Sequence, residues 1–444
     1  MTTRARWWIV AAVAAVLAAG LVLAFLFVPR TAPPSVQAST PPPASVSSSP
    51  PSSTTAASPS AASTTAASTT APPVPSTAPP PPTSATPPPA SGPAQGSPAA
   101  QRLAAMTLAQ KVGQVLMVST PVTGADANSL YALDSLHVGN VFMKGRSAAG
   151  SGAIAAVVSA VTAHVGPGTA GVRPFVATDQ EGGFVQIMQG PGLDTIPQAI
   201  VQGQLPPAQL QADATRWGQQ LAAVGVNVNL APVLDTVPGA AFAPQNAPIG
   251  AFGREYGYTP AAVSSHGVAF ARGMLAAGIS PTVKHFPGLG RVIGNTDVTA
   301  GVTDSVTVRN DPYVQPFRDA VNAGVPWLML SNAYYPKIDA AQLAPYSAVI
   351  IQGMVRGDLG FRGIIVSDDM CDAVQVSGVP IAERGVDFIA AGGTMALCTD
   401  QALLPQMYEG LVAAAQSDPA FAAQVDAAAL LVLNAKSATG LLGK

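Results

Sequence analysis

Residues that can do nucleophilic or acid–base chemistry follow short apolar stretches of this chain. Residues 363–370 read GIIVSDDM, an apolar segment that ends in the adjacent acids Asp368 and Asp369. If the segment is a strand, successive side chains point to opposite sides, so only one aspartate can face a binding site. The pattern fits a single carboxylate nucleophile whose neighbour is held by backbone donors. Taken alone, the same residues also fit a solvated turn.

Three other stretches carry residues suited to binding a polar ligand. In 177–186 (ATDQEGGFVQ), Asp179 precedes a glycine pair that lets the backbone approach a ligand, and the acids supply acceptors for hydroxyl groups. Lys284 and His285 end another apolar run, where a buried lysine needs a carboxylate or a polar ligand as its partner. Arg254 lies in a glycine-flanked loop. Taken alone, 177–186 also fits a tight turn with a capping carboxylate. Lys284 and His285 also fit a pair on the protein surface, and Arg254 also fits a structural ion pair.

The elements that must position these residues recur along 102–444. Eight short apolar segments, each followed by a helical stretch such as 210–224 or 260–277, lie at 114–120, 139–144, 174–179, 226–232, 280–286, 326–332, 363–369 and 394–398. Their continuous apolarity indicates strands buried on both faces, and polar residues gather at their carboxyl ends. We therefore predict an α/β fold, a (β/α)8 TIM-like barrel, with these ends meeting at one mouth. An open doubly wound sheet is the alternative, but no glycine-rich dinucleotide fingerprint follows the first segment.

Four motifs, DQEGG, APVLD, KHFPG and GFRGIIVSDDM, occur in an order and spacing that resemble glycoside hydrolase family 3. The most similar group is the single-barrel bacterial β-N-acetylglucosaminidases (β-N-acetylhexosaminidases) that trim peptidoglycan fragments, and the resemblance covers about residues 102–435. It implies a retaining reaction through a covalent glycosyl-enzyme intermediate, without a cofactor, in which Asp368 is the nucleophile. It also implies that the sugar is bound by Asp179, Arg254, Lys284 and His285.

The sequence departs from the family pattern where the acid/base residue is expected. The family has Asp-Ser-His in this loop, and this chain has Asn295, Thr296 and Asp297. A free aspartate titrates near ~3.9 and a histidine near ~6.5, so a carboxyl that serves as general acid at neutral pH needs burial or a neighbouring carboxylate. We expect Asp297 to replace the histidine opposite Asp368, the arrangement of two carboxylates that most glycosidases use. Asn295 would orient a neighbour in the site by hydrogen bonding.

Two alternatives stay open because of such departures. Phe184 and Ile187 stand where this group has arginine, which allows a β-glycosidase of different sugar specificity. Loss of the histidine allows a catalytically impaired protein that binds cell-wall saccharides. The retained nucleophile favours an enzyme, because a protein that only binds needs none.

The first 101 residues differ in composition from the rest. Residues 1–6 contain Arg4 and Arg6, which predict a cytoplasmic N-terminus. Residues 7–28 are uncharged and mostly apolar, long enough to span a ~30 Å bilayer core as a helix. Residues 29–101, rich in Pro, Ser, Thr and Ala, predict a disordered linker to the catalytic barrel at 102–444. We expect a single-pass membrane protein with its barrel outside the cytoplasm, or a secreted one if a signal peptide is cleaved after Ala38.

Composition narrows the possible partners. The formal charge of −2 gives no electrostatic reason to expect nucleic-acid binding. The chain has four histidines, none with metal-ligand spacing, so no metal site is expected. Cys371 and Cys398 can form a disulfide or remain buried thiols. We expect a monomer whose partners are a carbohydrate substrate and, through the N-terminal helix, the membrane.

Overall fold

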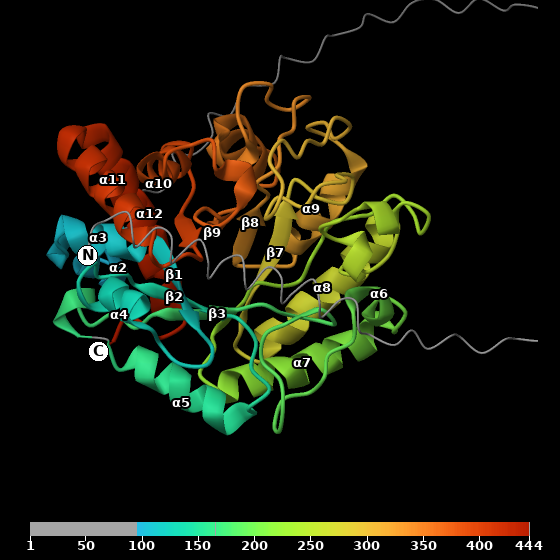
Figure 1. Cartoon of the computed structure of the whole chain (residues 1–444), viewed down its shortest axis with the longest axis horizontal. Helices are drawn as coiled ribbons and strands as arrows, with labels where there is room; N and C mark the ends of the chain where they lie inside the picture. The colour runs from blue at the N-terminus through green and yellow to red at the C-terminus, as the bar shows by residue number, and fades with distance from the viewer. Residues whose placement is uncertain (1–95, 165, 444) are drawn as a thin grey trace, which may run out of the picture. The chain divides into compact units, whose positions relative to one another are not determined.

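The computed structural model describes residues 96–164 and 166–443 of the chain. In this part, eight strands close into a barrel in which every neighbouring pair is parallel (Figure 1). The barrel strands are β1 (Leu116–Pro121), β2 (Asn140–Lys144), β3 (Phe175–Thr178), β6 (Val228–Asn229), β7 (Ser280–Phe286), β8 (Trp327–Leu330), β9 (Ile364–Asp369) and β10 (Met395–Cys398). Each predicted apolar segment forms one strand, so the (β/α)8 barrel is confirmed and the open sheet is excluded.

Helices lie around the outside of the barrel (Figure 1). The α-helices are α2 (Pro98–Ala105), α3 (Leu108–Gln114), α4 (Ala127–Asp134), α5 (Ser151–Thr162), α6 (Ala199–Gln202), α7 (Pro207–Ala223), α8 (Pro260–Ala276), α9 (Gln315–Asn322), α10 (Ile381–Ala390), α11 (Leu404–Ser417) and α12 (Pro419–Ala438). The two helices predicted at 210–224 and 260–277 are confirmed as α7 and α8. The start of α8 is fixed by its sequence, because Thr259 accepts a hydrogen bond from the Ala262 amide and Pro260 occupies the first turn.

The predicted N-terminal segments fall mostly outside the described residues. Residues 1–6 and the apolar segment 7–28 lie outside them, as does the linker up to residue 95. Helix α2 spans the predicted boundary between linker and barrel, and its Ala99 packs in a small cluster with Val172, Leu433 and Leu442. Among the helices of residues 96–443, none has both the length and the apolar character needed to cross a bilayer.

The strands are buried on both faces, as their unbroken apolar composition predicted. All seven residues of β7 are buried, including Lys284 and His285 at its end. Val118 of β1 and Val366 of β9 are likewise inaccessible to solvent. Burial of apolar surface stabilises the fold by roughly 25 cal/mol per Å². The rigid wall of strands thus fixes the positions of the polar residues at its carboxyl ends.

The segment after β9 is joined to the end of β10 by covalent and hydrogen bonds. Cys371 and Cys398 form a disulfide, which decides between the two states that the sequence allowed. Beside it, one carboxylate oxygen of Asp369 accepts the amides of Cys371 and Thr399 at 3.0 and 2.9 Å. The other accepts the Asp372 amide at 3.0 Å and the Thr399 hydroxyl at 2.6 Å. Asp369 is therefore the backbone-held member of the aspartate pair, as predicted, and Asp368 is free to face a ligand.

Candidate active site

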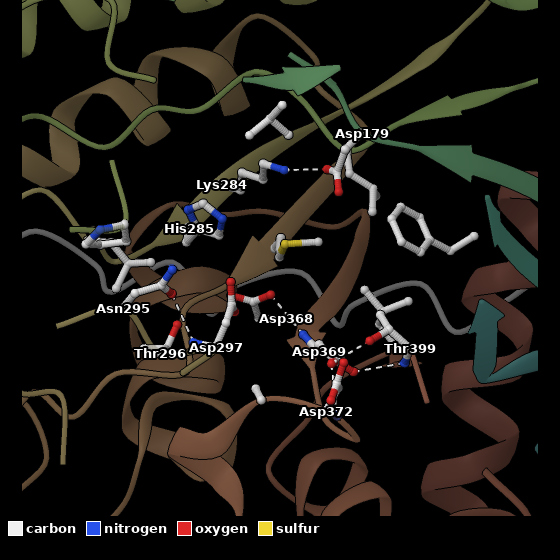
Figure 2. A pocket seen from close by; sticks show the side chains of 18 of the residues that line it. Asp179, Lys284, His285, Asn295, Thr296, Asp297, Asp368, Asp369, Asp372 and Thr399 are labelled. Atoms are coloured by element: carbon white, nitrogen blue, oxygen red, sulfur yellow. Dashed lines mark hydrogen bonds and ion pairs between the residues drawn. The ribbon is translucent and has the colours of Figure 1, made fainter. Parts of the chain in front are cut away.

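A cleft of about 450 Å³ opens at the carboxyl ends of the barrel strands (Figure 2). It brings together all seven residues that the sequence singled out, and they come from segments far apart in the chain. These residues are Asp179, Arg254, Lys284, His285, Asn295, Asp297 and Asp368. The predicted convergence at one mouth of the barrel is thus present in the structure.

One side of the cleft holds a buried network of two cations and two acids. Lys284 Nζ lies 2.6 Å from Asp179 Oδ1 and 2.7 Å from Glu181 Oε1. The guanidinium of Arg254 donates two hydrogen bonds to the Glu181 carboxylate, from Nε at 2.8 Å and from Nη2 at 2.7 Å. Burial alone would raise the pKa of Glu181, but Arg254 and Lys284 outweigh it and lower this pKa to about 2. Glu181 is thus ionised at neutral pH, and the network offers both donors and acceptors to a polar ligand.

Glu181, in the DQEGG motif, was considered with Asp179 as an acceptor for hydroxyl groups, but only Asp179 was then predicted as a site residue. It sits on β4 (Gln180–Gly182), which pairs with β5 (Val185–Gln186) in a small antiparallel hairpin after β3. Gly182 has a φ of 112°, and a Cβ there would lie 2.2 Å from the Pro197 carbonyl oxygen. The motif therefore needs glycine for close packing, and this packing turns Glu181 toward Arg254 and Lys284. The sequence placed the acid beside the glycines but did not identify its partners.

Replacing Glu181 with glutamine is expected to destabilise the fold by about 3–5 kcal/mol, because the buried Lys284 and the partly buried Arg254 are then balanced by Asp179 alone. The midpoint of urea unfolding measures the loss. Glu409→Gln is a matched control on the exposed surface of α11, where the change should be within about 0.5 kcal/mol. Equal unfolding midpoints for the two variants would contradict the role of the network.

His285 is oriented by a buried carboxylate from the segment that follows β6. Its Nδ1 lies 2.7 Å from Asp235 Oδ2, and the other oxygen of Asp235 accepts the Leu289 amide at 2.7 Å. Asp235 is fully buried, so this contact is shielded from solvent. The bond to Nδ1 leaves Nε2 as the ring nitrogen available to a ligand. Asp235 ends the APVLD motif; its position after an apolar run was the only sequence signal for this role.

Asp368 lies at the end of β9, half-buried in the cleft. Its Oδ1 accepts the Asp369 amide at 2.8 Å, which fixes the carboxylate. Burial raises the pKa of Asp368 to about 6; His285 opposes this rise, and Asp297 adds to it. Figure 2 shows the carboxylates of Asp297 and Asp368 directed toward each other. Repulsion between the two carboxylates raises the pKa of Asp368, as is expected for two acids that share one small site.

The family resemblance implies that Asp368 is the nucleophile, which must be ionised to react. Because the pKa of Asp368 is raised to about 6, we expect kcat/KM to fall as the pH drops through about 6. The profile is measured with an aryl β-N-acetylglucosaminide on wild type and on Asp297→Asn. Since Asp297 contributes to the raised pKa of Asp368, its removal should move the acid limb to lower pH. An acid limb near the ordinary aspartate value of ~3.9 in wild type would contradict this reading.

The loop that carries Asp297 is bound to the segment that follows β9. The Asn295 side-chain oxygen accepts the Asp297 amide at 3.0 Å, so Asn295 shapes this turn while lining the cleft. The Asp297 and Thr296 carbonyls accept the amides of Val374 and Gln375 at 3.1 and 3.0 Å. The Asp297 side chain itself is exposed. A carboxyl group that serves as general acid was expected to need burial or a neighbouring carboxylate. Asp297 has Asp368 as its neighbouring carboxylate but is not buried.

The two positions where arginine was expected are occupied differently. Ile187 is buried in the cleft wall, near the apolar side chains of Val185 and Leu230 that also line it. Phe184 is 56% exposed and stacks on Phe252, with a centroid separation of 4.6 Å. This part of the wall is therefore apolar. No cluster of three or more histidine, cysteine or acidic residues suited to a metal occurs among residues 96–443.

A barrel mouth with two facing carboxylates beside a set of paired charged groups is typical of the glycosidase class. Residues 107–435 match the glycosyl hydrolase family 3 N terminal domain, and the chain belongs to this family. It is similar to the crystal structure of a β-N-acetylhexosaminidase from Beutenbergia cavernae DSM 12333, with 49% identity and a TM-score of 0.74, over 75% of this chain and 99% of that one. The predicted resemblance to the family is confirmed.

Two further relatives carry related names. A family 3 β-N-acetylglucosaminidase from Paenibacillus sp. str. FPU-7 is 26% identical with a TM-score of 0.68, over 77% of this chain and 64% of that one. A beta-hexosaminidase from Stenotrophomonas maltophilia (strain K279a) is 35% identical over 220 residues, 47% of this chain. The match spans 62% of that curated relative.

Proposed function

We propose that the protein is a retaining β-N-acetylhexosaminidase that removes terminal β-linked N-acetylglucosamine from peptidoglycan-derived fragments. The observation that carries the proposal is the placement of Asp368 and Asp297 in one cleft, with the Lys284–Asp179–Glu181–Arg254 network at its side. The name of the 49% identical relative from Beutenbergia cavernae supports the choice of sugar.

The sugar is held by the groups that the barrel fixes most rigidly. Asp179 accepts hydrogen bonds from sugar hydroxyls while Lys284 and Arg254 donate to them, and His285 contributes its free Nε2. Because the charged groups are already paired with one another, they need little reorganisation when the substrate enters. Their positions orient the anomeric carbon over Asp368.

The reaction proceeds in two displacements at the anomeric carbon. In the first, an Asp368 oxygen bonds to this carbon while the glycosidic C–O bond breaks, and the Asp297 carboxyl gives its proton to the departing oxygen. In the second, the Asp297 carboxylate takes a proton from a water molecule whose oxygen displaces Asp368. The product keeps the β configuration, and both carboxyl groups return to their starting states.

A different sugar specificity is the second candidate. The observation that favours it is the apolar wall formed by Val185, Ile187 and Leu230. An isoleucine cannot form the charged hydrogen bonds of an arginine, so the preferred sugar can differ at the group that faces this wall.

The sugar preference is tested with purified residues 96–444 and a panel of methylumbelliferyl β-glycosides. We expect hydrolysis of the N-acetylglucosaminide with a kcat/KM at least ~10²-fold above that of the glucoside. A reversed preference would overturn the choice of sugar and favour the second candidate. Muropeptides that are bound without turnover would leave only the saccharide-binding alternative.

We also propose that the barrel works outside the cytoplasm, tethered by residues 7–28 or secreted after their removal. The Cys371–Cys398 disulfide supports an oxidising compartment, since such bonds are rare in the cytosol. Cell fractionation of the full chain tests the proposal. Recovery of the full chain from the cytosol, with both cysteines reduced, would overturn it.

A further inference from the structure

A second cleft lies at the opposite end of the barrel from the proposed active site. Its volume is about 340 Å³, and it lies between the π-helical segment Val349–Asp358, α10 and α12. Arg356 locates it, because Nη1 donates to the Gly363 carbonyl at 2.8 Å and Nη2 to the Thr394 hydroxyl at 3.1 Å. Gly363 and Thr394 immediately precede β9 and β10, so this is the amino-terminal end of the strands.

The charged side chains that line this cleft are both arginines. Arg356 and Arg362 are accompanied by the amides of Gln352 and Gln424, and no acid lines the cleft. The acid closest along the chain, Asp358, does not line the cleft and is bound by Arg309 at 2.6 and 2.9 Å. The cleft thus concentrates positive charge without a carboxylate to balance it.

Both guanidinium groups have N–H groups that donate no hydrogen bond within the described residues. Arg356 Nε, and Arg362 Nε and Nη2, have no acceptor within residues 96–443. Arg356 is half-buried, and burial together with the Arg362 charge lowers the pKa of Arg356 to about 10. A half-buried cation beside a like charge is unfavourable, and a bound anion would relieve it. The floor and walls are otherwise apolar or small; they are made by Ile389, Gly392, Gly393, Ala427, Ala428 and Leu431.

We propose that this cleft, named here the Arg356–Arg362 cleft, binds a small oxyanion ligand such as a phosphate monoester. Guanidinium groups match the planar geometry of phosphate and carboxylate oxygens, and two of them can bind one anion from two directions. The volume exceeds that of a phosphate ion alone, and the apolar lining suits a ligand with a small carbon skeleton. Because the cleft is far from the barrel mouth, binding is independent of the hydrolytic reaction.

Calorimetric titration of the disulfide-bonded protein tests the proposal, with inorganic phosphate, methyl phosphate and acetate at constant ionic strength. Saturable binding is expected, strongest for methyl phosphate. Arg362→Gln should weaken it at least ~10-fold, which is about 1.4 kcal/mol. Arg173→Gln is the matched control, since this exposed arginine lines a different cleft, where its guanidinium donates to the Gly440 carbonyl. Hydrolysis of the aryl substrate should be unchanged in both variants, so this test is separate from that of the proposed function.

Three outcomes would overturn the proposal. The first is no saturable heat with any of the three anions. The second is equal weakening by the two substitutions, which would mean nonspecific attraction of an adventitious ion. The third is binding to phosphatidylglycerol vesicles without binding to methyl phosphate, which would assign the arginines to a membrane surface.

Discussion

Replacing Asp368 with asparagine should reduce kcat/KM for an aryl β-N-acetylglucosaminide on the order of 10⁴-fold or more, because an amide cannot form the glycosyl ester. The stability of the fold should not decrease. Burial raises the pKa of the Asp368 carboxyl, so the ionised form is less favourable in the folded state than in the unfolded chain. Above pH 6, an uncharged asparagine should therefore unfold at the same temperature as wild type or at a higher one.

Asp372→Asn is the matched control for Asp368→Asn. Asp372 lines the same cleft four residues further along the chain, and its well-exposed side chain forms an ion pair with Lys144 at the surface. Its loss removes the same charge without touching the proposed reacting atoms, so turnover should change far less. Comparable losses in the two variants, or a lowered melting temperature only in Asp368→Asn, would contradict the assignment of Asp368 as the nucleophile.

Replacing Asp297 with asparagine should produce a loss that depends on the leaving group. A general acid contributes about 10²–10⁴-fold when the departing oxygen needs a proton, so disaccharide and alkyl substrates should slow by this factor. A nitrophenyl leaving group departs with little help, and its glycosylation step should be nearly unaffected. Pre-steady-state bursts and kcat/KM across a series of aryl glycosides measure the difference.

Asn295→Ala serves as the comparison for Asp297→Asn. Asn295 supplies the oxygen that accepts the Asp297 amide, so this variant loosens the turn but keeps the carboxyl group. Its loss should be smaller and its dependence on the leaving group weaker. A uniform loss across all leaving groups in Asp297→Asn would instead mean that Asp297 only binds substrate.

The fold could be predicted because its signal is repeated eight times along the chain. Each buried parallel strand requires a continuous apolar run, and each run ends where the chain reaches the mouth of the barrel. The same rule gave Asp179, Lys284 and Asp368, since all three end or directly follow such runs. For the adjacent pair Asp368 and Asp369, alternation along a strand predicted that one would be held by backbone donors. The resemblance to the family, which implies that Asp368 is the nucleophile, then indicated that the residue held by backbone donors is Asp369.

The partners within the site could not be predicted, because they depend on which strands and loops lie side by side at the barrel mouth. The Glu181–Arg254 contact joins residues 73 positions apart, and the Asp235–His285 contact joins residues 50 apart. Neither sequence spacing nor residue type selects these pairs among the other acids and bases. The Cys371–Cys398 disulfide was open for the same reason. The exposure of Asp297 could not be predicted either, because it depends on the turn that Asn295 forms at the cleft.

Azide rescue of Asp297→Ala tests the central claim most directly. Without its base, this variant should accumulate the glycosyl-enzyme formed with an activated substrate, because water attacks slowly. Azide needs no base, so added sodium azide should accelerate turnover and release a β-configured glycosyl azide, identified by proton NMR. Absence of acceleration, or an α-configured azide, would contradict the account of Asp297 and Asp368 as the acid/base and nucleophile of one retaining site.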